Sequence, residues 1–193
     1  MTTQTTFVTT MNALREFHKA SCDHTPGARR QALVKPVYPT VSAFTSLTPE
    51  ETAAVEGLKE DSQRNGAVNT NEIQNQITAD TERFKESGGG DAASEEFRKR
   101  MEEKRAAQKE SSNKMIDDMF DKAIGIGEKY PATQGAILSV SDQIMAFFSK
   151  LYNEIYFWVS NIVEQFVEWV KNAWENIKNT ARRIVDWISN WFK

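Results

Sequence analysis

Residues 141–193 read SDQIMAFFSKLYNEIYFWVSNIVEQFVEWVKNAWENIKNTARRIVDWISNWFK and contain neither proline nor glycine. Large apolar residues recur through this stretch about every 3.6 positions, the period of a straight α-helix, and not every roughly 3.5 positions as in a left-handed coiled coil. All five tryptophans of the chain fall within it. The pattern predicts one long C-terminal amphipathic helix, or two, that starts at Ser141 or Asp142 and bends or breaks near 176–180, where polar residues cluster.

The apolar face of this stretch needs cover, because leaving so many Trp and Phe side chains in water would cost on the order of tens of kcal/mol. The preceding sequence holds few large apolar residues, so we expect the cover to come from outside the monomer. Three kinds of cover stay open: a membrane interface, a bundle with other copies or a partner, and a bilayer-spanning helix. Charged residues interrupt 144–170, which disfavours the span, whereas tryptophan-rich amphipathic helices are typical of the headgroup plane.

The predicted membrane-binding residues are indoles at the headgroup boundary and aliphatic or phenyl side chains below them. They are Ile155, Trp158, Ile162, Phe166, Trp169, Trp174, Ile184, Trp187, Ile188 and Trp191. Basic residues of the same stretch would contact anionic lipid, namely Lys171, Lys178, Arg182 and Arg183. The predicted partner is therefore a lipid bilayer, joined by further copies of the chain or by another protein if the helices also assemble.

The rest of the chain differs from this tail in composition. Residues 1–45 carry a net charge of +3 and predict an N-terminal arm, with a short helix followed by a proline-containing extended segment at 34–44. Residues 46–124 are rich in acid and base and predict a charged helical spacer with a glycine hinge at 88–90. With 136–193 as the amphipathic module, the predicted fold is all-α and elongated.

Helix signals divide the charged spacer further. Thr-Pro-Glu-Glu at 48–51 predicts a capping box and a helix start, with the first helix ending near Asp61. A second helix is expected to begin near Thr70 and to end at the three glycines. A third is expected over 91–124, where Gly125-Ile126-Gly127 would break it.

Composition argues against an enzyme. Only 39% of the 193 residues are hydrophobic, which is thin for the core of a compact domain of this length. With 24 basic and 27 acidic residues, the chain lacks the positive field that attracts nucleic acid. The cluster His18, Cys22 and His24 offers at most three zinc ligands where a structural site needs four, so neither a metal nor a cofactor is predicted. No catalytic residue is predicted either.

Three short segments carry a resemblance: WVSN at 158–161, FVEWVK at 166–171 and IVDWISN at 184–190. Their amino-acid sequences resemble those of the amphipathic membrane-anchoring helices that precede the ATPase in picornavirus-like nonstructural polyproteins. The chain lacks the Gly-x-x-x-x-Gly-Lys-Ser/Thr loop of such an ATPase, so no nucleotide chemistry carries over. The resemblance implies a viral membrane-associated protein, either linked to replication or carried in the virion and released at entry.

The functional hypothesis is accordingly a membrane-binding or membrane-perturbing protein that acts through its C-terminal amphipathic helix. It would be located at host cell membranes, or in the virion interior before release. The alternative is a structural or assembly protein, such as a minor virion or ejected internal protein, whose C-terminal helices oligomerise. A bacterial or phage pore-former would share the lipid chemistry.

Overall fold

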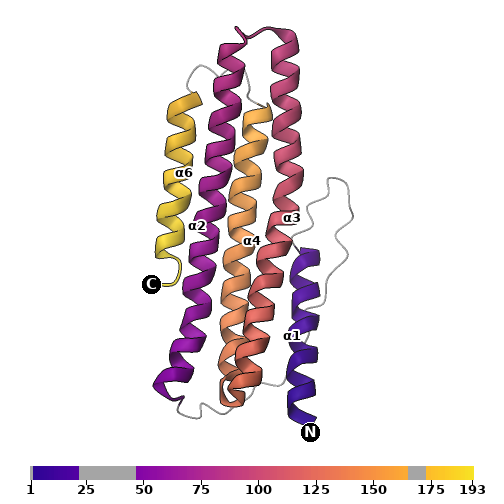
Figure 1. Ribbon diagram of the computed structural model, residues 1–193, viewed down its shortest axis with the longest axis vertical. Coiled ribbons are helices and arrows are strands. Elements are labelled where there is room, and N and C mark those ends of the chain that lie inside the picture. Colours follow the sequence, from indigo (N-terminus) through magenta and orange to yellow (C-terminus); the bar gives the residue numbers. More distant parts are fainter. Residues whose placement is uncertain (1, 22–46, 165–172) are drawn as a thin grey trace. The chain divides into compact units, whose positions relative to one another are not determined.

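The computed structural model describes residues 2–21, 47–164 and 173–193. These residues form helices and no strands, which confirms the all-α class. The elements are α1 (Thr2–Ser21), α2 (Pro49–Glu86), α3 (Asp91–Lys129), the short 3-10 helix η1 (Pro131–Thr133), α4 (Gln134–Glu164) and α6 (Ala173–Asn190) (Figure 1).

The chain folds into two compact units, and three of the helices contribute residues to both units. The first unit is built from Met1–Ser62 and Ser112–Ser149, and the second from Gln63–Ser111 and Lys150–Lys193. Each unit therefore takes parts of α2, α3 and α4. This division differs from the consecutive segments drawn from the sequence, in which 46–124 formed one spacer.

In the first unit, α1 packs against the C-terminal half of α3. Met11 and Leu14 of α1 are fully buried, as are Ile116 and Phe120 of α3. The Lys19 ammonium donates to both carboxylate oxygens of Asp117, at 3.0 and 3.1 Å, so charge complementarity supports the apolar contact. The apolar residues of this segment, Met115, Ile116, Met119 and Phe120, therefore belong to the core of the first unit.

Gly127 makes room for the ring of Phe7 in this unit. A Cβ added at Gly127 would overlap Phe7, whereas one added at Gly125 would meet nothing within 4 Å. We expect Gly127→Ala to destabilise the first unit by about 1–3 kcal/mol, because the buried ring must shift. Gly125→Ala is the matched control and should stabilise α3 by about 0.5–1 kcal/mol, since alanine favours helix. Urea denaturation of the two variants tests this, and equal midpoints would contradict it.

In the second unit, α2 and α3 form a helical hairpin. Gly88, Gly89 and Gly90 close it, and all three have positive φ angles, 75°, 74° and 102°, which favour glycine. Just below this turn, the rings of Phe84 and Phe97 lie 5.8 Å apart. The predicted break at 88–90 is thus present as the turn of a packed hairpin.

The start of α2 follows the sequence prediction closely. The backbone N–H of Thr48 donates to the Glu51 carboxylate at 2.8 Å, and the N–H of Glu51 donates to the Thr48 hydroxyl at 3.2 Å. These two reciprocal bonds are the predicted capping box. The prediction that α3 begins directly after the glycines, at Asp91, is also confirmed.

Several predicted helix breaks are wrong. The first and second predicted helices are one helix, α2, which continues through 62–69. Gly125 and Gly127 lie inside α3, which ends only at Lys129. The C-terminal amphipathic region begins at Gln134 instead of Ser141, and α6 continues without a break through 176–180. The predicted extended segment at 34–44 lies outside the described residues.

Candidate functional site

The candidate site is the amphipathic surface of α6 together with the part of α4 that lies in the second unit. The side chains of Ile177, Ala181, Ile184 and Ile188 are buried and recur at spacings of three and four residues along one face of α6. The opposite face is exposed and carries most of the charge of α6. Its charged members are Glu175, Lys178, Arg182, Arg183 and Asp186.

The second unit itself covers most of the predicted membrane-binding residues that the structure describes. Ile155, Trp158, Ile162, Ile184 and Ile188 are at most 5% exposed. Trp187 and Trp191 are half-buried. The expectation that the chain could not cover this surface is therefore wrong for these residues. Phe166, Trp169 and Lys171 lie outside the described residues, as does the side chain of Trp174.

α6 lies antiparallel to α4 and contacts α2 as well (Figure 1). Nη1 of Arg183 donates to Oε2 of Glu154 at 2.8 Å, which joins α6 to α4. The amide of Gln63 on α2 donates to the carbonyl oxygen of Ile188 at 3.0 Å, which satisfies a backbone acceptor in the last turn of α6. Polar contacts to two neighbouring helices thus hold the C-terminal half of α6.

A lysine and two indoles form a further contact at the same end. Nζ of Lys150 on α4 lies 4.9 Å from the ring centroid of Trp187 and 5.3 Å from that of Trp191. The two indoles meet edge to face, with centroids 5.1 Å apart. Both distances to the ammonium are within the range of a cation–π interaction. We call this group the Lys150 clasp, and it consists of Lys150, Trp187 and Trp191.

The apolar cover in the second unit is uneven. Among its described residues, the parts of α4 and α6 bury eleven apolar side chains, whereas the α2–α3 hairpin buries five. The hairpin buries as many polar side chains as apolar ones, namely Asn69, Thr70, Asp80, Thr81 and Gln108. Most of the buried apolar side chains in the described part of the second unit therefore belong to α4 and α6.

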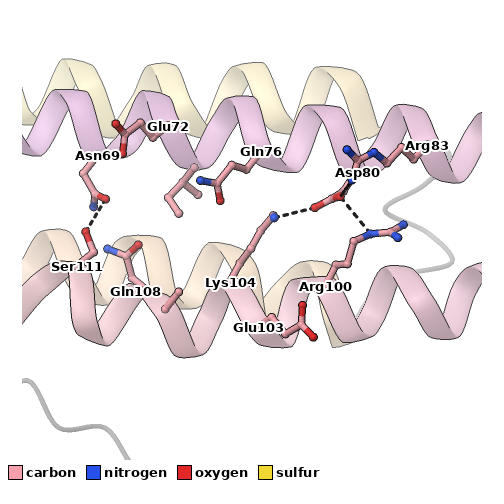
Figure 2. A pocket seen from close by; sticks show the side chains of 12 residues that line it. Asn69, Glu72, Gln76, Asp80, Arg83, Arg100, Glu103, Lys104, Gln108 and Ser111 are labelled. Atoms are coloured by element: carbon pink, nitrogen blue, oxygen red, sulfur yellow. Dashed lines mark hydrogen bonds and ion pairs between the residues drawn. The ribbon is translucent and has the colours of Figure 1, made fainter.

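Asp80 is the centre of the polar side of the hairpin (Figure 2). Its carboxylate is 4% exposed and forms ion pairs with Nε of Arg100 at 3.1 Å and with Nζ of Lys104 at 2.8 Å. Arg83 on α2 adds a third, more exposed cation at 3.5 Å. These pairs join α2 to α3 and line a cleft of about 410 Å³ that also contains Gln108. The hairpin therefore has its own electrostatic link between its two helices.

Some buried polar groups of the second unit lack a hydrogen-bond partner within the described residues. They include the indole N–H of Trp158, the Ser160 hydroxyl and both polar atoms of the Gln108 side chain. The side-chain nitrogen of Asn69 also lacks a hydrogen-bond partner there, although the side-chain oxygen accepts a hydrogen bond from the Ser111 hydroxyl at 3.0 Å. Each such group costs about 1–3 kcal/mol. Trp158 and Ser160 are the two of these residues that lie on α4.

The buried Asp80 was missed in the sequence analysis, although a signal for it exists. Ile73, Ile77 and Phe84 recur at helical spacing along one buried face of α2. Asp80 lies three residues after Ile77 and four before Phe84, which places it on that same face. A carboxylate on an apolar stripe, with several cations in the following helix, indicates a buried ion pair.

Two other predictions concern metals and membrane spans. His18 stacks on Phe120 with ring centroids 6.4 Å apart, while Cys22 and His24 lie outside the described residues. Within the described ranges no group of His, Cys, Asp and Glu is arranged to hold a metal ion. In the same ranges, no helix combines the length and the hydropathy that crossing a bilayer requires.

Comparison with known proteins identifies no relative. No protein-family model matches the chain, and no curated protein or solved structure matches it significantly. The functional proposal below therefore depends on the chemistry of the described residues.

Proposed function

We propose that this protein binds the surface of lipid membranes, by separating α6 from α4 and exchanging their mutual apolar cover for lipid. The apolar face of α6 would enter the headgroup boundary, and the apolar stripe of α4 would be the second part of the lipid-binding surface. The α2–α3 hairpin would stay folded. The single observation that carries this proposal is the uneven cover, with eleven buried apolar side chains on α4 and α6 against five on the hairpin.

The energetics of the exchange support the proposal. Burying an Ile side chain gains about 1.5–3 kcal/mol, and an acyl-chain environment offers a similar gain to the same side chain. Ile177, Ile184 and Ile188 therefore lose little apolar transfer energy when protein is replaced by lipid. Two other factors then decide the exchange. The polar contacts of α6 favour the state in which α6 packs against α4, and the unpartnered polar groups near α4 disfavour that state.

The distribution of charge and aromatic side chains supports a headgroup location. Lys178, Arg182 and Arg183 are exposed on the polar face of α6, where they could approach lipid phosphates without being buried. Trp187 and Trp191 are half-buried at the C-terminal end of the helix. Indoles at the border between an apolar and a polar face are typical of helices that lie in the membrane interface.

Vesicle flotation of the full chain tests the proposal. We expect it to float with vesicles that contain phosphatidylglycerol, and to bind neutral phosphatidylcholine vesicles at least fivefold more weakly. Raising the salt concentration should weaken binding to the phosphatidylglycerol vesicles, because the cations of α6 are exposed. Absence of binding to both kinds of vesicle would reject the proposal. A discrete oligomer in sedimentation without any lipid binding would favour the assembly alternative.

A further inference from the structure

We propose that the Lys150 clasp controls the release of α6, and that an anionic lipid headgroup opens it. This inference rests on the proposed function, because it names the regulation of the same surface. Lys150 is exposed, so a phosphate can reach its ammonium without rearrangement of the helix. The ammonium would exchange its contacts with the two indoles for the phosphate, and the indoles would become free to enter the headgroup region.

The clasp is placed where it has the greatest influence on α6. Trp187 is in the last turn of the helix, and Trp191 follows its last residue, Asn190. Both contact a lysine on another helix, so the clasp ties the C-terminal end of α6 to α4. A helix terminus separates more readily than a helix centre, because fewer contacts must be lost at once. The clasp therefore lies at the end from which α6 would leave.

Charge around the clasp also favours an acidic trigger. Arg183 lies one turn before Trp187 on α6, and its partner Glu154 lies one turn after Lys150 on α4. An anionic surface would attract both Lys150 and Arg183, and would repel Glu154. Each effect weakens a contact between α6 and α4 and none strengthens it. A neutral lipid surface carries no net charge and therefore does not compete for Lys150 and Arg183 in this way.

The test replaces Lys150 by methionine in the full chain, which keeps the apolar stem and removes the charge. Hydrogen exchange is first measured without lipid. We expect the amides of α6 to exchange about two- to fivefold faster than in the wild type, as expected for the loss of an exposed cation–π contact. Lys150→Arg should restore the slow exchange, because a guanidinium also binds aromatic faces. Lys99→Met removes an equal charge from the exposed surface of α3 in the same unit and should leave the rate unchanged.

Lipid binding gives the second readout. Lys150→Met should bind neutral vesicles more tightly than the wild type, and so reduce the preference for acidic vesicles more than Lys99→Met does. Exchange in α6 of Lys150→Met at the wild-type rate would overturn the proposed clasp. Faster exchange without lipid binding by any variant would instead retain the clasp and reject the membrane function. The two failures are therefore distinguishable.

Discussion

Replacing Asp80 by alanine is expected to destabilise the second unit by about 2–3 kcal/mol. The carboxylate is 4% exposed, and its partners Arg100 and Lys104 are 20% and 17% exposed. Without Asp80 these two cations would remain largely buried beside each other, and their desolvation would no longer be offset. The cost stays below that of a fully buried pair because water still reaches both cations in part. Urea denaturation gives the total loss, and hydrogen exchange should locate it in the α2–α3 hairpin.

A matched control separates this effect from the general loss of a carboxylate. Asp118 accepts a hydrogen bond from Lys114 at 2.7 Å, and both side chains are more than half exposed. That bond raises the pKa of Lys114 above its ordinary value. Because solvent screens the pair, Asp118→Ala should leave the denaturation midpoint unchanged. If Asp80→Ala is as stable as Asp118→Ala, the ion pairs at Asp80 do not hold the hairpin together.

Local chemistry explains which parts of the fold could be predicted from the sequence. The capping box at Thr48 and Glu51 involves residues three apart, and the turn at Gly88 to Gly90 depends on the freedom of glycine itself. Neither feature requires knowledge of distant residues. The helical period of the tail is likewise a property of neighbouring residues, so the all-α class followed from it.

Two of the incorrect predictions involve contacts between residues far apart in the sequence. The segment 62–69 has several residues of low helix propensity, yet α2 continues through it, with Ser62 and Asn69 buried. Gly127 was read as a helix breaker, but it lies inside α3 where Phe7 needs space. In each case tertiary packing outweighs a propensity difference of about 1 kcal/mol or less per residue.

The covered surface of α4 and α6 could not be predicted for a related reason. Residues 1–140 hold few large apolar residues, which predicts too little apolar surface to bury the tail. The structure reaches burial differently, because α6 lies antiparallel to α4 and the two helices contribute most of the apolar side chains. Polar residues such as Asn69 and Gln108 complete the cover. Hydropathy along the chain does not reveal that a tail packs against itself.

The central claim is that α6 must separate from α4 before lipid binds, and a cross-link between the two helices should therefore abolish binding. Glu154 and Arg183 are suitable positions, because their side chains meet at 2.8 Å across the two helices. The variant carries cysteine at both positions, and serine at Cys22, the only native cysteine. A short bismaleimide then joins the pair. The matched control joins Asn69→Cys to Ser111→Cys within the α2–α3 hairpin, where those side chains meet at 3.0 Å.

Flotation with phosphatidylglycerol vesicles, before and after cross-linking, is the most direct measurement of this claim. The account predicts that the cross-link between α4 and α6 lowers binding at least tenfold, because the apolar faces stay covered. It also predicts that the cross-link within the hairpin leaves binding unchanged. Equal binding of the protein with α4 and α6 joined and of the same protein before cross-linking would contradict the account.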